Sequence, residues 1–362
     1  MKHMKKKNML LGLASILALL AVVFFTGAGA SEDNDFVNDT IILVDSAGRT
    51  VEVPYPVESV VVLWSNPARE LRALGVVDRI VGMDQSTKDE VDMGKLPELA
   101  DAPVVGTQEE PNFEKIAQLK PDVVIALSAG YPPEPAEIEK KLEPFGIPVV
   151  GLDFYRTEVW FEEIEKLGKM MGREAEARDY SDFFAGYYEE INDTLVVIPD
   201  AEKKTVYFEG AKKYQTYGGA GYGSGIPNMI RYSGGKDLYP EREELAFEIN
   251  PEDVAKRNPD VIFKGTPLGW QEVNDTQFKS LRDEIMSRPE LANTSAVKNG
   301  QVYVISFDVA GGAGKKFGPV FLAKALYPEK FQDLDPMTFY QEYLEKFQGL
   351  NNQGVYLYPR NF

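Results

Sequence analysis

The chain contains Asn112-Phe-Glu-Lys-Ile-Ala-Gln-Leu-Lys-Pro-Asp-Val-Val124 and, 138 residues later (250 − 112), Asn250-Pro-Glu-Asp-Val-Ala-Lys-Arg-Asn-Pro-Asp-Val-Ile262. The two stretches align without a gap, and Asn, Glu, Ala, Pro, Asp and Val stand at the same places in both. A pattern repeated at this distance, in a chain of 362 residues, predicts two similar lobes. Paired lobes in turn suggest a cleft between them.

Each copy is expected to start with a short helix. Asn112 and Asn250 are good N-cap residues, because the amide side chain accepts a hydrogen bond from a free N–H of the first turn. Pro251 suits the first helical position, where no N–H donor is needed. Glu114 and Glu252 fall in the first turn, where the positive end of the helix dipole stabilises a carboxylate.

Each copy is expected to end with a buried strand. Pro121 and Pro259 stop the helices, and residues 123–127 and 261–263 are continuously apolar. Such runs are typical of strands covered on both faces of a parallel sheet. The chain is therefore predicted to be an α/β protein with two Rossmann-like lobes, parallel-rich sheets and a ligand cleft between the lobes.

A helical middle separates the two copies. Residues 157–171 predict one amphipathic helix, closed by Gly172, and residues 173–195 predict a second whose apolar positions recur every three or four residues. At ~1.5 Å per residue the second helix reaches roughly 35 Å, enough to join two lobes as a stiff rod. The predicted organisation is an N-terminal lobe over 41–172, a connecting helix over 173–197, a C-terminal lobe over 198–349 and an aromatic tail over 350–362 that finds no place in this scheme.

The remaining elements are predicted from shorter patterns. Residues 41–53 read as a hairpin, and further strands are expected at 60–63, 81–82, 148–152, 205–208 and 302–307. Further helices are expected at 65–74, 226–232, 281–286, 317–326 and 336–347.

The first thirty residues have the composition of a secretory signal. Four Lys precede a run of apolar and small residues, 9–25, and Ala28-Gly29-Ala30 offers a cleavage site before Ser31. An uncleaved membrane anchor is the alternative, because the run is slightly long for a cleaved signal and slightly short for a membrane span. Residues 31–40 are polar and acidic and are interpreted as a linker. The protein is therefore expected to be extracytoplasmic, in the periplasm or at the cell surface.

Cysteine and histidine usage excludes several classes of function. The chain has no Cys, and its one His, His3, lies inside the expected signal. A mature chain without either residue has no Ser-His-Asp or Cys-His catalysis, no Cys/His zinc site and no His-ligated haem. No catalytic residue, metal ligand or cofactor is assigned.

The charge of the chain is strongly acidic. Residues 1–30 hold four Lys and no acidic residue, so the remainder carries 35 basic and 57 acidic residues, a formal charge of −22. Such a surface repels nucleic acid phosphates and favours solubility. An anionic ligand would need a locally basic cleft.

Ligands of open parallel sheets lie at the carboxyl ends of the strands. That rule nominates residues in the loops after the predicted strands: Trp64, Ser65, Asn66, Ser128, Tyr131, Tyr155, Arg156, Tyr214, Tyr217, Lys264, Trp270 and Asp308. The aromatic members indicate a broad flat ligand or one carrying aromatic groups, although an aromatic side chain can also simply close the edge of a lobe.

The same loops carry basic residues that could supply positive charge against the acidic background. They are Arg156, Lys212, Lys213, Lys264, Lys315 and Lys316. Arg suits carboxylates held by two hydrogen bonds and could also face catecholate oxygens. Solvated surface lysines are the alternative interpretation.

Two glycine-rich loops do not indicate a nucleotide site. Residues 218–225 do not fit the dinucleotide-binding pattern, and in residues 309–316 a P-loop would need Gly where Val309 stands and Ser or Thr where Lys316 stands. The main-chain amides of either loop could still hold an oxyanion, so molybdate or tungstate stays open.

Several stretches together resemble one family. They are 45–53, 54–63, 74–82, both repeat copies, 234–235, 318–328 and 333–336, with Glu342, Tyr343 and Phe347. Over roughly residues 41–349 the chain resembles the solute-binding proteins of iron-siderophore and cobalamin ABC importers. The resemblance is specific for the family and weak for the ligand.

The resemblance implies one ligand held between two lobes that a long helix joins, and delivery to a membrane permease powered by a cytoplasmic ATPase. It also implies that a Glu on the outer face of each lobe docks against permease arginines, and Glu114 and Glu252 stand at positions that resemble those motifs. Stabilisation of the helix dipole would account for both residues without docking. A site for bare manganese or zinc is not expected, because related proteins for those ions rely on His.

The expected function is a non-enzymatic, monomeric extracytoplasmic receptor that captures a small-molecule metal complex, an iron complex of the siderophore kind. Cobalamin or another corrinoid, and molybdate or tungstate, are alternatives in the same fold. An exported carboxylate-based hydrolase is the alternative of another class, since Asp and Glu are abundant. It would need two carboxyl groups about 5–10 Å apart at one pocket.

Overall fold

The structure is a computed structural model that describes residues 36–37, 39–128, 130, 132–219, 224–270, 272, 274–351 and 354–360. The expected signal over 1–30, most of the expected linker and the nominated Tyr131 lie outside these residues.

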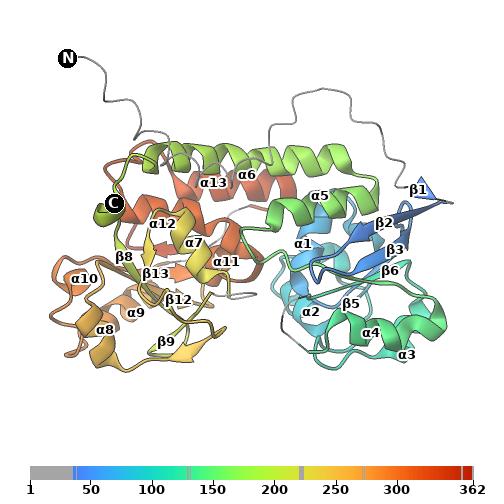
Figure 1. Ribbon diagram of the computed structural model, residues 1–362, viewed down its shortest axis with the longest axis horizontal. Coiled ribbons are helices and arrows are strands. Elements are labelled where there is room, and N and C mark those ends of the chain that lie inside the picture. The colour runs from blue at the N-terminus through green and yellow to red at the C-terminus, as the bar shows by residue number, and fades with distance from the viewer. Residues whose placement is uncertain are drawn as a thin grey trace, which may run out of the picture.

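Two separate sheets form the centres of two lobes (Figure 1). The N-terminal sheet has the order β5-β4-β6-β7 and is parallel throughout. Its strands are β4 (Val60–Val62), β5 (Ile80–Met83), β6 (Val123–Ala126) and β7 (Val149–Gly151). The C-terminal sheet has the order β10-β8-β12-β13-β14, in which only β14 runs antiparallel. Its strands are β8 (Thr205–Glu209), β10 (Lys236–Asp237), β12 (Val261–Thr266), β13 (Val302–Ser306) and β14 (Leu357–Tyr358).

The repeated pattern occupies the same place in each lobe. Its helices are α3 (Phe113–Leu119) and α8 (Pro251–Arg257), and the side chain of the N-cap Asn accepts a backbone N–H bond in both. Both helices end on a residue with a left-handed backbone, Lys120 (φ 50°) and Asn258 (φ 51°). The strands that follow, β6 and β12, are each third in the order of their own sheet. The prediction of two similar α/β lobes is confirmed.

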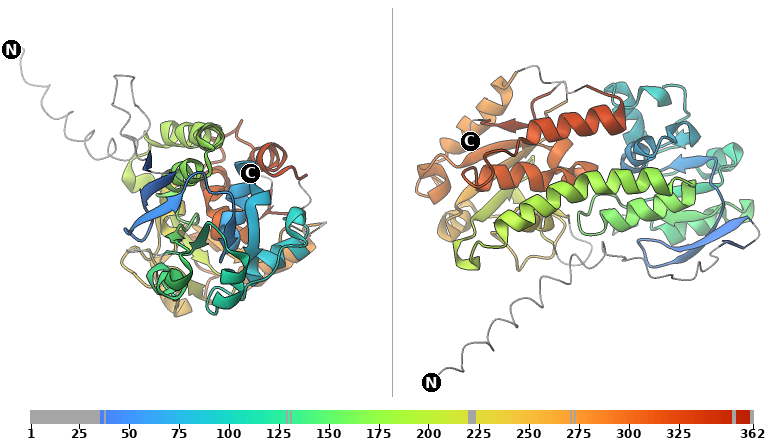
Figure 2. Two further views of the ribbon diagram at one scale, coloured as in Figure 1. Left: turned by 90° about the vertical axis from the view of Figure 1, so that its right-hand side faces the viewer. Right: turned by 90° about the horizontal axis from the view of Figure 1, so that it is seen from above.

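A long helix, α6 (Glu174–Leu195), crosses both lobes. Its 22 residues correspond to roughly 33 Å. Figure 2 shows it from above, packed beside α5 (Trp160–Met171), which ends at Gly172 with a φ of 61°. The predicted connecting rod is therefore present, and it buries one face, with Ala177, Tyr180, Phe184, Ile191 and Leu195 inside.

The other predicted elements form close to the expected places. A three-stranded antiparallel sheet contains the predicted hairpin, and its strands are β1 (Phe36–Val37), β2 (Thr40–Val44) and β3 (Thr50–Pro54). Helices predicted at least in part are α1 (Ser65–Ala73), α7 (Ile226–Tyr232), α9 (Thr276–Met286), α12 (Gly318–Leu326) and α13 (Pro336–Tyr343). Elements without a sequence prediction include α2 (Gln85–Asp92), α4 (Pro135–Leu142), α10 (Ser295–Lys298), α11 (Phe307–Ala310), β9 (Gln215–Thr216) and β11 (Phe247–Glu248). The strands β1, β10 and β14 were not predicted either, and β1 lies within the expected linker.

The end of the chain connects the lobes a second time. After α13 the helix widens into one π-helical segment, Leu344–Gln348, which packs against α1 of the N-terminal lobe. Gln348 Nε2 donates to the carbonyl of Arg69 over 3.1 Å. The aromatic tail then returns to the C-terminal lobe, where β14 pairs with β13.

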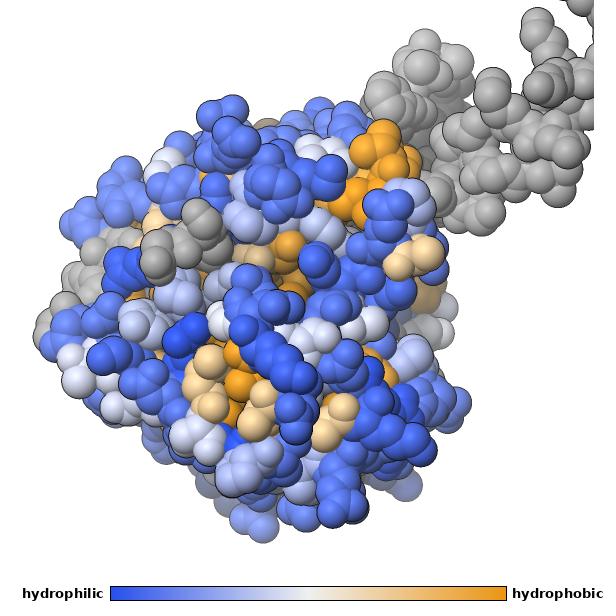
Figure 3. Space-filling view, turned by 90° about the vertical axis from the view of Figure 1, so that its left-hand side faces the viewer, coloured by the Kyte–Doolittle hydropathy of each residue, from blue (hydrophilic) through white to orange (hydrophobic). Residues whose placement is uncertain are grey.

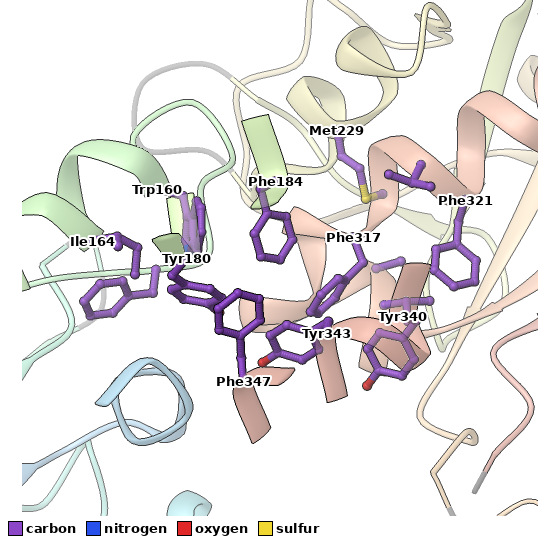
Figure 4. Close-up of a cluster of buried hydrophobic side chains, with 14 of the residues drawn as sticks. Trp160, Ile164, Tyr180, Phe184, Met229, Phe317, Phe321, Tyr340, Tyr343 and Phe347 are labelled. Atoms are coloured by element: carbon purple, nitrogen blue, oxygen red, sulfur yellow. The ribbon is translucent and has the colours of Figure 1, made fainter. Parts of the chain in front are cut away.

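One large core runs through both lobes beneath the connecting helix. Figure 4 shows its aromatic centre, in which Trp160, Tyr180 and Phe184 face Phe317, Tyr343 and Phe347. The Trp160 and Phe184 ring centroids are 4.8 Å apart, and those of Phe317 and Tyr343 are 4.6 Å apart. The two lobes are therefore joined by packed side chains as well as by the helix itself.

The outer surface is largely hydrophilic. The end face of the C-terminal lobe in Figure 3 shows apolar atoms only in separate patches. Among the described residues, the hydrophobicity and length that a membrane-crossing helix requires are not combined in any helix.

Candidate functional site

The carboxyl ends of the two sheets meet at a seam between the lobes. Asn66, in the first turn of α1, is buried there, and its side chain holds both sides together. Its Oδ1 accepts the backbone N–H of Ala313 from the C-terminal lobe over 3.0 Å, and its Nδ2 donates to the carbonyl of Asp153 over 3.1 Å. Asn66 therefore fixes the inner part of the seam.

A second contact across the seam involves the nominated Trp270 and Asp308. Trp270 Nε1 donates to the carbonyl of Met93 in the N-terminal lobe over 3.1 Å. The ammonium of Lys95 pairs with the Asp308 carboxylate, and the other oxygen of that carboxylate accepts the N–H of Trp270 over 2.9 Å. The side chains of the two lobes thus meet directly, as in a closed form.

A small, mostly buried aromatic cluster lies at the carboxyl ends of β4, β6 and β7. Trp64, Leu127 and Tyr155 pack into one small cluster. Across the seam, the Nζ of Lys315 lies 4.5 Å from the centroid of the Tyr155 ring. We call Trp64, Leu127, Ser128, Tyr155 and Lys315 the seam site.

Two polar atoms of the seam site are buried without a partner in the described residues. They are Trp64 Nε1 and Ser128 Oγ, at the ends of the adjacent strands β4 and β6. Indole nitrogen is a donor only, and a hydroxyl is both a donor and an acceptor. A buried donor that lacks a partner costs free energy, so both atoms are suited to an acceptor oxygen supplied by a ligand or by water.

Lys315 brings a buried positive charge to the seam site. Its side chain is nine-tenths buried, and no hydrogen bond or ion pair joins its ammonium to a described residue. Burial lowers the pKa of Lys315 to about 7, although the carboxylates of Glu158 and Asp153 oppose that shift. An anionic ligand would provide the counter-charge that the fold leaves incomplete.

Arg156, which follows Tyr155, is oriented by Asp153. Its Nη2 donates to Asp153 Oδ2 over 2.9 Å, and Asp153 Oδ1 accepts the N–H of Ser128 over 2.7 Å. The same loop is held by the buried Glu163, which accepts the N–H groups of Asp153 and Phe154 over 2.8 and 2.6 Å. Burial and the neighbouring Asp153 charge raise the pKa of Glu163 to about 7. These contacts fix the backbone at the end of β7.

Two nominated residues of the C-terminal lobe belong to a separate buried network. Lys264 donates to Glu209 Oε1 over 3.0 Å and to the carbonyls of Gly210 and Ala211. Arg288 forms two hydrogen bonds with Glu209, of 2.7 and 2.9 Å, and its guanidinium lies 4.7 Å from the Tyr214 ring centroid. The Lys264 ammonium therefore already has three partners within the protein.

The two remaining nominated residues, Ser65 and Tyr217, lie outside the seam site. Ser65 opens α1 at intermediate exposure, and Tyr217 packs against Phe208 with ring centroids 6.1 Å apart. Of the nominated residues, Trp64, Ser128, Tyr155 and Arg156 all follow the carboxyl ends of neighbouring strands of the N-terminal sheet. Asn66, Trp270 and Asp308 lie along the seam between the lobes.

Sequence reasoning missed the partners that build the seam. Met93, Lys95 and Glu70 carry contacts across the lobes but follow no predicted strand. Lys315 was recognised only as one of six basic loop residues. A local pattern cannot reveal that Lys316, its neighbour, pairs with a carboxylate 246 residues away.

Glu114 and Glu252 lie far from the seam. Both residues are exposed, on α3 and α8, and in the described part of the chain neither carboxylate forms a hydrogen bond or an ion pair. Figure 1 places α3 and α8 in different lobes on the side of the molecule opposite α6. The two helices that carry these residues therefore share one side of the molecule.

Two cavities lie away from the seam site. A cavity of about 510 Å³ lies between α12, α13 and the tail, and one of about 590 Å³ lies between the β2–β3 hairpin and α4. Neither is lined by a nominated ligand residue. In the ranges that the structure describes, no group of three or more His, Cys, Asp or Glu is arranged to hold a metal ion.

Comparison with known proteins gives one consistent result. Residues 60–309 match a family described as periplasmic binding protein. The chain is 26% identical over 307 residues to the Fe(3+)-citrate-binding protein YfmC of Bacillus subtilis, covering 82% of this chain and 89% of that protein. It is 26% identical over 334 residues to the molybdate-binding protein MolA of Haemophilus influenzae, covering 84% and 90%. Among solved structures, the TroA-like periplasmic binding protein FepB from Veillonella parvula aligns with a TM-score of 0.73 and 27% identity, covering 87% of this chain and 98% of that one.

Proposed function

Because the chain belongs to the periplasmic binding protein family, we propose that it captures an anionic iron complex outside the cytoplasm and delivers it to the permease of an ABC importer. The protein acts as a receptor in this proposal, as a monomer and without catalysis. Residues 1–30 direct its export, and an uncleaved segment would also anchor it.

The observation that carries the proposal is the chemistry of the seam site. Trp64 Nε1 and Ser128 Oγ, which have no partner among the described residues, can donate to acceptor oxygens, and Lys315 adds a positive charge that pairs with no described carboxylate. The indole ring of Trp64, which is only partly buried, gives an apolar face that suits an organic chelator, and the buried Tyr155 ring packs beside it. An oxygen-rich, negatively charged chelate satisfies all three requirements at once.

Two relatives support the choice and name its main rival. YfmC is described as binding Fe(3+)-citrate, which is an anionic oxygen-rich chelate. MolA is described as binding molybdate, and the donors of the seam site would suit that small oxyanion too. The partly exposed ring of Trp64 favours the larger ligand, because a bare oxyanion gains little from contact with an aromatic face.

The direct test is titration of the purified protein with defined probes. Ferric citrate, a ferric catecholate, cyanocobalamin and sodium molybdate are compared by calorimetry, and native mass spectrometry of protein from its own host identifies any cargo that co-purifies. Tighter binding of one of the ferric chelates supports the proposal. Preference for molybdate or cyanocobalamin, or a host cargo without iron, refutes it.

Two single substitutions separate the parts of the seam site. Trp64→Phe keeps a ring but removes the N–H donor, and Lys315→Met keeps the length of the side chain but removes its charge. Each is expected to weaken binding of the preferred ferric chelate by about tenfold to hundredfold, the usual range for a lost hydrogen bond or contact with a charged ligand. Neither should lower the melting temperature, because each removes a buried polar group that the protein itself leaves unpaired.

The pH dependence of binding tests the charge of Lys315. A pKa of about 7 means that the ammonium is largely neutral at pH 8.5 in the free protein. The affinity for an anionic probe should therefore fall as the pH rises from 6 to 8.5. Lys315→Met, titrated with the same probe, provides the matched control for protonation of the chelator. If the affinity for the probe changed with pH equally in the wild-type protein and in Lys315→Met, the charge of Lys315 would have no role in binding.

We propose in addition that Glu114 and Glu252 are the contacts with the permease. Their exposure and their shared side of the molecule allow one membrane partner to reach both carboxylates. Arginines on the permease would bind such carboxylates with two hydrogen bonds each.

Charge reversal tests this docking. The double variant Glu114→Lys/Glu252→Lys should abolish uptake of the iron complex in cells while its affinity for the complex stays unchanged. The control is Glu174→Lys, which reverses an exposed first-turn carboxylate of α6 on the opposite side of the molecule. It carries the same helix-dipole cost. Normal uptake by the double variant would contradict docking through these residues.

A further inference from the structure

The C-terminal tail contacts the loop that carries Trp270. The N–H of Val355 donates to the carbonyl of Gly269 over 3.3 Å, and the carbonyl of Tyr356 accepts the N–H of Ser306 over 2.8 Å. Val355, Tyr356 and Leu357 are all buried. The tail is thus built into the C-terminal lobe at the point where β13 ends.

The contact between the tail and this loop is too close for a side chain. A Cβ atom placed on Gly354 would lie 2.3 Å from the carbonyl oxygen of Gly269. On its other side, a Cβ on Gly269 would lie 2.2 Å from Ser306 Oγ and 2.5 Å from an Asp308 carboxylate oxygen. Gly269 is therefore enclosed between the tail and the end of β13.

Trp270 follows Gly269 directly, so the enclosed backbone of Gly269 also fixes where the backbone of Trp270 lies. Its N–H is held by Asp308 over 2.9 Å, and its indole N–H reaches the carbonyl of Met93 in the other lobe over 3.1 Å. An unbroken series of contacts therefore leads from Gly354 through Gly269 and Trp270 to the N-terminal lobe.

We propose that the tail segment Gly354–Tyr358, which ends in β14, is a positioning element for Trp270 and that it holds this side chain in place for closure of the lobes on the cargo. The tail lies beyond residues 60–309, the part that matches the family. The expected effect of the tail on cargo binding rests on the proposed function, whereas its expected effect on the position of Trp270 does not. When the loop that carries Trp270 is ordered before binding, association has a smaller entropic cost. Loss of the contact between the tail and this loop should therefore weaken binding.

The experiment uses tryptophan fluorescence in the full chain. The chain has three Trp, so Trp64→Phe leaves Trp160, which is 1% exposed, and Trp270, which is 7% exposed. In this background Gly354→Ala, and the bulkier Gly354→Val, are expected to increase quenching of Trp270 by acrylamide in the ligand-free protein. The matched control is Gly186→Ala on α6, where an added Cβ meets no atom within 4 Å.

Binding is then measured with Trp64 restored. Gly354→Ala should weaken binding of the preferred ferric chelate by about tenfold, with Gly186→Ala unchanged. Unchanged quenching in both Gly354 variants would overturn the proposal. Loss of the folded state in both Gly354 variants would overturn the proposal as well, because the tail segment would then be required for folding rather than for positioning Trp270. If no ferric chelate binds the wild-type chain, the proposed cargo fails, while the quenching result still decides the role of the tail.

Discussion

Lys316→Met is expected to lower the free energy of unfolding by about 3–5 kcal/mol, measured by urea denaturation at pH 7. The substitution would leave the carboxylate of Glu70 buried without its cation. Glu70 and Lys316 form an ion pair across the lobes, and both side chains are almost completely buried. Removing one partner of such a pair costs far more than removing a surface ion pair.

The surroundings of the pair explain the size of the effect. The Nζ of Lys316 lies 5.3–5.5 Å from the ring centroids of Trp160, Tyr180, Phe317 and Tyr343, which belong to the aromatic centre in Figure 4. Tyr180 donates its hydroxyl to the second oxygen of Glu70 over 2.8 Å. Water cannot replace the lost cation in this setting without opening the core.

The neighbouring lysine provides the control. Lys315→Met should change the free energy of unfolding by less than about 1 kcal/mol, because within the described ranges Lys315 pairs with no carboxylate that the substitution would leave uncompensated. Glu70→Gln combined with Lys316→Met should recover part of the loss, since neither buried charge then remains. A Lys316→Met cost no larger than that of Lys315→Met would show that the pair does not join the lobes energetically.

Glu209→Gln is expected to be the second large loss, again about 3–5 kcal/mol at pH 7. Glu209 is fully buried at the end of β8 and is the shared partner of Lys264 and Arg288. The substitution would leave two buried cations facing a neutral amide. Glu284→Gln is the control, because Glu284 binds the same Arg288 from an exposed position and should cost about 1 kcal/mol or less.

The pH dependence of Glu209 has a definite sign. Burial alone would raise the pKa of Glu209, but hydrogen bonds from Arg288 and the charge of Lys264 lower it below 4.5. A lowered carboxyl pKa means that the stabilisation is present above pH 4.5 and is lost as the pH falls through the folded-state value. The difference in stability between wild type and Glu209→Gln should therefore shrink in acid. A difference that is constant from pH 7 to pH 3 would exclude this account.

The seam site shows why only part of the proposed binding residues followed from sequence. Trp64, Ser128 and Tyr155 were accessible to prediction because each stands directly after a strand, and strand ends are recognisable from apolar runs and turn residues. Lys264 and Tyr214 satisfied the same rule, yet they belong to the network around Glu209. The rule locates an edge of the sheet, but it does not tell toward which neighbour a side chain turns.

The sequence by itself determined the two lobes, the rod between them and the helix starts of the repeat. Those features depend on N-caps, prolines and apolar periodicity, which act over a few residues and can be read locally. Only the tertiary structure decided that Lys316 pairs with Glu70, that Trp270 reaches Met93, and that the tail closes on Gly269. These contacts join residues 86–246 positions apart. They are set by how packed surfaces fit together, for which no local pattern exists.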